Sequence, residues 1–314
     1  MQNHPEHPRL PRWARALAAL TLLGLTLWGF VRLAGYGLDW LDSRRSSEAL
    51  RQVYYSQPDT DMPAPTEAPA TPTAVPLTPA PTAIPAATLP PMTQPGLPAV
   101  SYPDNPRLQI SSRFRALRNK SKYIVGWLTA PGLLDEAVAQ RNNTSYLTHD
   151  ALGAKNVNGA IFLDESISLK TRPYTLILYG HNMKTGAMFG SLRNYETLSF
   201  YHKAPLITFD TLYEEGRYVI FAAGSIGTEP ADRNFVDFYA LTSNDPEKRQ
   251  TAIRKLQTVS VHTCTVDVQP DDQLLLLVTC VEQDDERRVI VARRLRDGED
   301  EKELIKQVEK SRKK

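Results

Sequence analysis

Residues 273–280 read QLLLLVTC and residues 287–295 read RRVIVARRL, with the polar segment VEQDDE between them. Both runs are short, rich in aliphatic and β-branched residues and bounded by polar residues, which predicts two β-strands. A hairpin through the polar segment would return the start of the second strand to the end of the first, where Cys280 lies. The fold is predicted outward from this pair of strands.

Six further runs have the same character and are bounded by Gly, Pro, Asn or Asp. They are YIVGWLTAP (123–131), GAIFLDE (159–165), YTLILYGHN (174–182), APLITFD (204–210), GRYVIFAAG (216–224) and TVSVHTCTVDV (258–268). Helices are expected beside them at residues 111–120 and 245–256. The eight runs predict a mainly β domain, built as a closed or nearly closed eight-stranded barrel with a few flanking helices.

The composition excludes several classes of function. The 314-residue chain carries 37 basic and 35 acidic residues, so its formal charge of +2 gives no reason to expect nucleic acid as a partner. Its two cysteines are too few for a disulfide scaffold, a zinc ribbon or an iron–sulfur centre. Neither a glycine-rich nucleotide fingerprint nor an H-E-x-x-H metal motif occurs. We therefore expect no metal site and no cofactor.

The N-terminal region predicts a membrane anchor. Residues 16–31, ALAALTLLGLTLWGFV, contain no charged residue, and three arginines precede them. We predict a transmembrane helix over residues 16–38, with residues 1–15 in the cytoplasm by the positive-inside rule. A cleaved signal peptide is the alternative, but nothing after Val31 fits an A-x-A-like cleavage site. The chain is therefore expected to be a single-pass protein of the cell membrane with its globular part outside the cell.

A proline-rich segment follows the predicted anchor. Thirteen of the 24 prolines lie between Pro58 and Pro98, among Ala and Thr residues without apolar periodicity. This composition predicts an extended polyproline II spacer, and we assign residues 39–104 to a linker. An O-glycosylated stalk and a ligand for a polyproline-binding domain are compatible alternatives. The globular domain is then expected over residues 105–296, and the charged tail over residues 297–314 is expected to be a solvated helix.

The two cysteines are the candidate nucleophiles. Cys264 lies in the middle of the predicted strand 258–268, which is typical of a small buried residue. Cys280 ends an apolar strand and precedes a polar loop, so we expect it at the rim of the barrel, where a strand holds a side chain toward a substrate. A Cys264–Cys280 disulfide is the alternative, and the spacing alone does not exclude it.

A reactive thiol needs a nearby cation or imidazole, because the thiolate is the attacking form. His181 follows a predicted strand as Cys280 does, with a glycine before it and a loop after it. Arg288 opens the last predicted strand, and the hairpin would return its guanidinium to the same rim, where it suits a developing oxyanion. Arg287 stands next to it, and the residues alone do not choose between the two arginines.

At these residues the sequence closely resembles the sortases, the membrane-anchored cysteine transpeptidases of Gram-positive surfaces, and among them class B. LLVTC (276–280) looks like the family's T-L-x-T-C signature, and RVIVA (288–292) resembles its arginine strand. YGHNMKTGAMFGSL (179–192) resembles the class B histidine segment. Residues 125–132, 143–150 and 159–164 resemble the strands and loops beside the site. The likeness extends over about residues 111–295.

The resemblance implies a sortase-type barrel and roles for individual residues. Cys280 is implied as the nucleophile, His181 as the acid, and Arg288 with the backbone amide of Val281 as the oxyanion donors. It also implies a peptide groove, lined by Asn143, Leu147, Phe235, Val236, Val278 and Thr279. The sequence departs from the family at Leu276, where the signature has its first Thr, at Val278, where class B enzymes often have serine, and at Val281, which is acidic in some members.

The implied activity is transpeptidation: Cys280 cleaves an extracellular sorting motif after its Thr, forms a thioester and passes the acyl group to an amine. The implied partners are surface proteins with a C-terminal sorting motif and an amine acceptor, either a lipid-linked peptidoglycan precursor or a pilin lysine. Two alternatives stay open. One is a cysteine hydrolase with water as acceptor, and the other is a non-enzymatic surface module with a Cys264–Cys280 disulfide.

Overall fold

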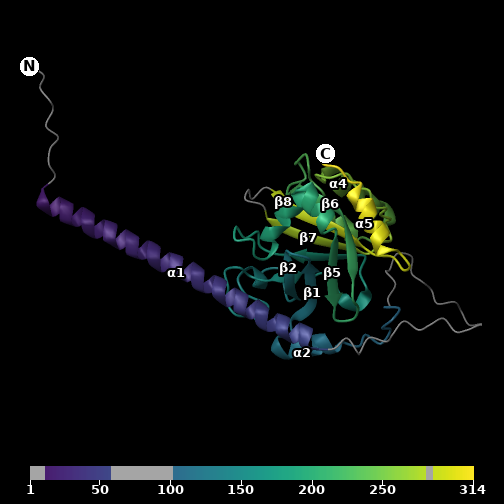
Figure 1. Ribbon diagram of the computed structural model, residues 1–314, viewed down its shortest axis with the longest axis horizontal. Helices are drawn as coiled ribbons and strands as arrows, with labels where there is room; N and C mark the ends of the chain where they lie inside the picture. Colours follow the sequence, from purple (N-terminus) through teal and green to yellow (C-terminus); the bar gives the residue numbers. More distant parts are fainter. Residues whose placement is uncertain (1–10, 58–101, 281–285) are drawn as a thin grey trace, which may run out of the picture.

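The computed structural model describes residues 11–57, 102–280 and 286–314, and its centre is a closed barrel of eight strands (Figure 1). The strand order around the barrel is β1-β2-β3-β4-β7-β8-β6-β5, and β5 pairs back onto β1. The strands are β1 (Ile124–Ala130), β2 (Leu134–Ala139), β3 (Ile161–Leu163), β4 (Thr175–Tyr179), β5 (Leu206–Thr211), β6 (Arg217–Gly227), β7 (Leu274–Cys280) and β8 (Glu286–Arg294). The predicted eight-stranded barrel is confirmed.

Two neighbouring pairs in the barrel are parallel, β2 with β3 and β4 with β7, and the other pairs are antiparallel. A parallel pair needs a long crossover connection. Between β4 and β7 the chain forms β5 and β6 and the helices η3 (Phe189–Glu196), α3 (Leu198–Lys203), η4 (Phe238–Thr242) and α4 (Pro246–Val259). Because β4 and β7 run in the same direction, their C-terminal ends meet at one rim of the barrel.

The leucine run of β7 does not alternate with polar residues, because both faces of the strand are buried. Residues 274–277 are all buried. One face of β7 lines the barrel interior, and η3 packs against the strand from outside. A strand covered on both faces reads as a continuous apolar run. The strand is therefore held rigidly up to the point where Cys280 ends it.

The helices follow local signals in the sequence. α2 (Ser112–Lys120) and α4 form where amphipathic patterns predict them. At the start of α4 the side chain of Asp245 accepts a hydrogen bond of 2.9 Å from the backbone N–H of Glu247, and Pro246 occupies the first turn. A capping aspartate and an early proline are both favoured at a helix N-terminus.

The strand expected over residues 258–268 does not form. α4 continues to Val259, and the chain then runs without a strand, forming isolated bridges such as Gly224 with Ser260. The physical reason is that β6 already pairs with β5 on one edge and with β8 on the other, so the closed barrel leaves no free edge for this segment. The barrel's eighth strand is instead β2, whose sequence LDEAVA has little strand propensity and is held by β1 and β3.

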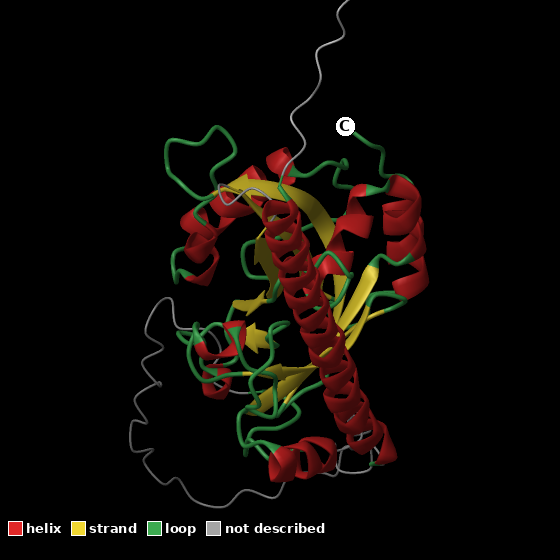
Figure 2. Ribbon diagram, turned by 90° about the vertical axis from the view of Figure 1, so that its left-hand side faces the viewer, coloured by secondary structure: helices red, strands yellow, loops and turns green. Residues whose placement is uncertain are grey.

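Helix α1 spans Arg12–Ser56, so residues 39–56, which the sequence analysis assigned to the linker, are helical. Figures 1 and 2 show its C-terminal end beside α2 at one end of the barrel, while its N-terminal half leads away. Large apolar side chains there are exposed, among them Leu20, Leu23 and Phe30. Within the described ranges no helix is long and apolar enough to cross a membrane. The transmembrane helix over residues 16–38 stays a prediction.

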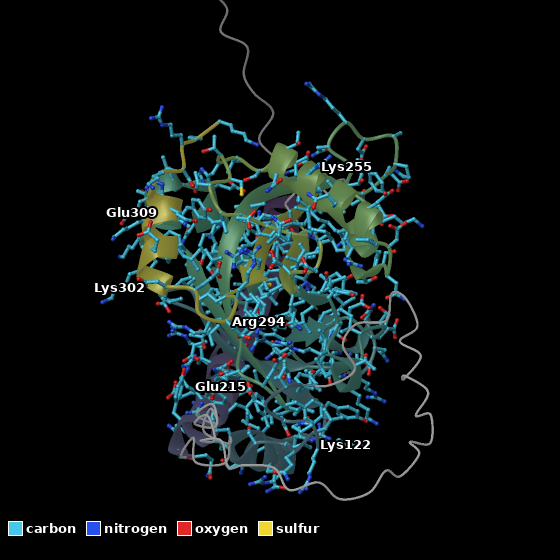
Figure 3. The ribbon with its side chains drawn as sticks, turned by 90° about the vertical axis from the view of Figure 1, so that its right-hand side faces the viewer. Lys122, Glu215, Lys255, Arg294, Lys302 and Glu309 are labelled. Carbon is cyan, nitrogen blue, oxygen red and sulfur yellow. The ribbon has the colours of Figure 1, made fainter. Side chains whose placement is uncertain are left out.

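The C-terminal tail packs against the domain instead of standing free in solvent. Helix α5 (Glu301–Glu309) buries Leu304 and Val308. The hydroxyl of Thr265 donates to the carbonyl of Gln307 at 2.7 Å, which ties the tail to the segment after α4. Figure 3 shows the labelled Lys302 and Glu309 on the outer side of α5. Residues 297–314 thus form part of the folded domain.

The end of α1 is attached to the barrel by a buried polar contact. The Tyr54 ring stacks on Trp127 of β1 with centroids 4.4 Å apart, and its hydroxyl donates to the carboxylate of Asp210 on β5. Asp210 also accepts from the backbone N–H of Gly216 at 3.2 Å. Burial raises the pKa of Asp210 to about 6, although the Tyr54 hydrogen bond acts in the opposite direction. The folded protein therefore holds the Asp210 proton more tightly than the unfolded chain does.

The contribution of Asp210 to the free energy of unfolding should fall as the pH rises from about 4 to about 7. Asp210 titrates near its ordinary value when unfolded, so its protonated form favours folding below about pH 4, and this contribution is lost as the pH rises through about 6. We expect the free energy of unfolding of the wild type to fall by up to about 3 kcal/mol between pH 4 and 7 relative to Asp210→Asn. Urea denaturation at several pH values measures this. The exposed Asp297→Asn is the control, and equal pH profiles for wild type and Asp210→Asn would refute the assignment.

Candidate active site

The parallel pair of β4 and β7 brings the two predicted reactive residues to one rim. Tyr179 at the end of β4 is in register with Val278 of β7, and the backbone N–H of Gly180 donates to the carbonyl of Val278 at 3.3 Å. His181 lies two residues beyond Tyr179, as Cys280 lies two residues beyond Val278. Adjacent strands are about 5 Å apart, so this register places the backbones of His181 and Cys280 side by side.

A cavity of about 820 Å³ opens at this rim. Every residue predicted for the peptide groove lines it, together with His181; these are Asn143, Leu147, Phe235, Val236, Val278 and Thr279. The other main contributors are Arg287, the neighbour of Arg288, and four aromatic residues that were not among the predicted groove residues, namely Phe162, Tyr179, Phe238 and Tyr239. A largely aromatic and aliphatic cavity of this size with a few polar groups suits an extended peptide.

The position of Cys280 follows from strand register, because the structure describes its backbone alone. Cys280 pairs directly with Arg287 across the β7–β8 hairpin, and Thr279 pairs with Arg288. Directly opposed residues in antiparallel strands point to the same face, and the next pair points to the other face. Val281, predicted to supply an oxyanion amide, lies outside the described residues.

The structure gives the two arginines different contacts. Arg288 does not line the cavity; its Nε donates to Glu196 of η3 at 2.7 Å and its side chain is 12% exposed. Arg287 lines the cavity and shares the face of Cys280. Strand alternation puts these neighbouring residues on opposite faces, and the role of Arg288 as the oxyanion donor stays a prediction. Arg287 is the arginine positioned to act at the rim.

The His181 ring is held by the backbone of the loop before β3. Its Nε2 donates to the carbonyl oxygen of Leu147 at 2.7 Å, since a carbonyl oxygen accepts only. Gly159 packs against the same edge of the ring: a Cβ there would lie 3.1 Å from Cδ2 of His181 and 2.2 Å from the carbonyl oxygen of Tyr146. With φ of +60° as well, position 159 requires glycine. His181 thus has one fixed orientation at the cavity wall.

A buried carboxylate ties the cavity walls together. Asp164 accepts from the hydroxyls of Tyr179 at 3.1 Å and Tyr239 at 3.0 Å, and from the amide of Asn143 at 3.1 Å. Burial alone would raise the pKa of Asp164, but the hydrogen bonds from Ser166, Tyr239 and Tyr179 outweigh it and keep the pKa below its ordinary value. The ionised carboxylate therefore fastens η4, which carries Tyr239, over the end of β4.

Cys264 is a free thiol, so the alternative of a Cys264–Cys280 disulfide is wrong. It is half-buried near the end of α4, where its Sγ accepts from Gln257 at 3.4 Å and donates to the carbonyl of Val266 at 3.2 Å. Burial raises the pKa of the Cys264 thiol, which disfavours the nucleophilic thiolate. Across residues 11–57, 102–280 and 286–314, no three His, Cys, Asp or Glu side chains group closely enough to hold a metal ion.

Curated relatives identify the family. The sortase B of Listeria monocytogenes is 30% identical over 176 residues, which is 55% of this chain and 68% of the Listeria protein. The chain belongs to the sortase B family. The sortase B of Staphylococcus aureus is 31% identical over 175 residues, covering 54% of this chain and 68% of that protein. No protein-family model matches. The resemblance to class B sortases is thus confirmed, and the protein is a sortase, a cysteine transpeptidase.

Solved sortase B structures match the barrel. A Staphylococcus aureus sortase B–substrate complex has a TM-score of 0.54 at 29% identity, covering 60% of this chain and 88% of that one. A sortase B complexed with triglycine has a TM-score of 0.54 at 28% identity, covering 61% of this chain and 89% of that one. Sortase B from Bacillus anthracis in complex with AAEK2 has a TM-score of 0.61 at 21% identity over 82% of this chain and 97% of that one, which supports the fold alone.

The two arginines can be separated by conservative replacement. We expect Arg287→Lys to lower kcat/KM for peptide cleavage by about 10²-fold, because lysine lacks the planar donor fork at the rim. Arg288→Lys should change it less than about threefold and act on stability through the contact with Glu196. Steady-state kinetics with thermal unfolding of both variants measures this. Loss of activity in Arg288→Lys alone would restore the assignment made from the sequence.

The Tyr239 hydroxyl should act on peptide binding. Tyr239→Phe removes one hydrogen bond to Asp164, which is worth about 1 kcal/mol, and loosens η4 over the cavity. We expect KM for the peptide to rise about fivefold with kcat nearly unchanged. Tyr123→Phe, at a tyrosine that does not line the cavity, is the matched control. An unchanged KM in Tyr239→Phe would show that this contact does not shape the peptide site.

Proposed function

We propose that this sortase cleaves an extracellular sorting motif after its Thr through a thioester on Cys280 and transfers the acyl group to a primary amine. The observation that carries the proposal is the meeting of the Cys280 end of β7, His181 and Arg287 at one peptide-sized cavity. A Staphylococcus aureus sortase B has been solved with a substrate and another sortase B with triglycine, which supports a peptide donor and an amine acceptor.

In the first half-reaction the Cys280 thiolate attacks the threonine carbonyl carbon, and an electron pair moves onto the carbonyl oxygen. The guanidinium of Arg287, with the amide of Val281, stabilises this oxyanion. His181 as imidazolium gives its proton to the leaving nitrogen, and the C–N bond breaks. The products are an acyl-enzyme thioester and the free amine of the departing segment.

In the second half-reaction an incoming amine attacks the thioester. The neutral His181 imidazole takes a proton from the attacking nitrogen, the C–S bond breaks, and the Cys280 thiolate is regenerated beside an imidazolium. Protons and charges therefore return to their starting state after each cycle. We favour the peptide amine of a peptidoglycan precursor as acceptor over a pilin lysine, because the triglycine complex of a relative has a peptide amine as ligand.

The lining of the cavity supports an apolar sorting motif. Val278 presents a buried aliphatic side chain two residues before Cys280, and Phe235 and Phe238 contribute aromatic surface from the β6–β7 connection. The polar groups of the lining include the Asn143 amide, the tyrosine hydroxyls around Asp164, and the charged side chains of Glu229, Asp237 and Arg287. This arrangement favours aliphatic residues before the reactive threonine.

We also propose that residues 16–38 anchor the enzyme in the cell membrane, with residues 1–15 in the cytoplasm and the barrel outside. The support is the uncharged run 16–31 behind three arginines, and the exposed apolar side chains on the part of α1 that leads away from the barrel. An anchored enzyme meets lipid-borne acceptors and secreted clients at the same membrane surface.

Mass spectrometry tests the proposed reaction. We expect the full chain in detergent micelles, incubated with a library of threonine-containing peptides, to form a thioester on Cys280 and to yield a ligated product when triglycine is added. Cys280→Ala and His181→Ala should each abolish ligation, while Cys264→Ala should be nearly silent. Cleavage without amine dependence would identify a hydrolase, transfer to a lysine-bearing protein alone would identify a pilin polymerase, and no Cys280 adduct would contradict the proposal.

A further inference from the structure

A second groove, of about 1020 Å³, lies on the other side of the His181 segment. Its walls are residues 43–52 of α1, residues 132–136 around the β1–β2 turn, and the loop of residues 185–188 that follows His181. The sorting-peptide cavity shares none of these residues. The reaction steps above leave this groove without a role.

The side-chain amide of Asn158 gives the groove a hydrogen-bond donor that has no partner among the described residues. Its side chain is 3% exposed and lines the groove, and its Nδ2 has no hydrogen-bond partner among the described residues. A buried polar group without a partner is rare in folded proteins, because it has lost its water without compensation. An amide nitrogen donates only, so the missing partner is an acceptor such as a peptide carbonyl or a carboxylate.

His181 lines the peptide cavity and lies close to the chain segment that carries Asn158. The Nε2 of His181 contacts the carbonyl of Leu147, which lines the peptide cavity. The ring atom next to Nε2, Cδ2, lies close to Gly159, the chain neighbour of Asn158. Consecutive Cα atoms are about 3.8 Å apart, so a ligand bonded to Asn158 reaches the neighbourhood of the imidazole. Asn158 in the groove is therefore the chain neighbour of the residue that packs against the imidazole, and the groove shares no lining residue with the peptide cavity.

The charges in the groove suit a ligand that carries both signs. Arg51 pairs at 2.7 Å with Glu48 and with Asp135, but its nearest approach to Glu136 is 3.9 Å. Burial raises the pKa of Glu136, which disfavours its ionised form. A cationic group on a ligand would stabilise the ionised carboxylate. Arg45 lies exposed at the rim and offers a cation in turn. A peptide can carry all three groups that the groove favours: a carbonyl acceptor for Asn158, an ammonium for Glu136 and a carboxylate for Arg45.

We propose that this groove binds the body of the acceptor substrate, an amine-bearing peptide with both acidic and basic groups, and directs its reacting amine past His181 to the thioester. The inference rests on the proposed transpeptidase function and adds the place where the second substrate binds. Holding the acceptor beside the imidazole that deprotonates it makes the attack effectively intramolecular.

The location fits an acceptor carried at a membrane surface. Ser43, the first α1 residue in the groove, is five residues beyond the end of the proposed anchor at residue 38. At about 1.5 Å per residue the groove then begins roughly 8 Å from the membrane boundary. A peptide attached to a lipid on the outer surface is presented at this height.

The test measures acceptor KM separately from thioester formation. The full chain in detergent micelles is charged with a sorting peptide and resolved with triglycine or with the longer Gly-Gly-Gly-Ala-Lys-Glu. The wild type should show a lower KM for the longer acceptor. Asn158→Leu should raise that KM about fivefold and leave the rate of thioester formation unchanged, with an equal or higher unfolding temperature because the lost donor had no partner. Asn244→Leu, at an exposed residue outside the groove, is the control.

A second variant tests the class of ligand. Glu136→Gln keeps the side-chain shape and removes the charge, so it should abolish the preference for Gly-Gly-Gly-Ala-Lys-Glu over Gly-Gly-Gly-Ala-Gln-Glu. Normal thioester formation with an unchanged KM for the longer acceptor in both variants would overturn the acceptor site and leave the proposed function intact. Failure of the wild type to form any thioester would overturn both.

Discussion

The parallel pairing of β4 with β7 is the constraint on which the active site depends. Because the two strands run in the same direction and stay in register to Tyr179 and Val278, their next residues emerge at the same rim. His181 and Cys280 are 99 positions apart in the sequence, and this register makes them neighbours. The long crossover through β5, β6 and α4 makes that pairing possible, and the strands it contributes close the barrel so that it has no free edge.

Because side chains alternate along a strand, the two faces of the β7–β8 hairpin make different contacts. One face carries Arg287, the register partner of Cys280, to the cavity, and the other carries Arg288 to Glu196, which fastens η3 against the strands. Neighbouring arginines of the same chemistry thus make different contacts, Arg287 with the cavity and Arg288 with Glu196. The carboxylate of Asp164 performs a comparable fastening role on the opposite wall through two tyrosines.

Much of this could be predicted from the sequence, since seven strands and the reactive positions Cys280 and His181 follow from apolar runs that end in polar loops. The face of each arginine could not, because the register across a hairpin depends on the conformation of its loop, and a slip of one residue exchanges the faces. The missed strand β2 and the wrong strand at 258–268 show the same limit: closure of the barrel, not local propensity, decides which segments pair. Tyr179, directly before Gly180 at the end of its strand, had a usable signal, whereas Tyr239 lies in the short helix η4 without one.

The most direct test of the account is a crystal structure of the full chain trapped on Cys280 by a thiol-reactive analogue of its sorting peptide. The account predicts that the peptide fills the cavity between Leu147 and Tyr239, with its reacting oxygen within hydrogen-bond distance of the Arg287 guanidinium and His181 on the opposite side. A peptide bound elsewhere, or an oxygen held by Arg288 with Arg287 turned to solvent, would contradict it.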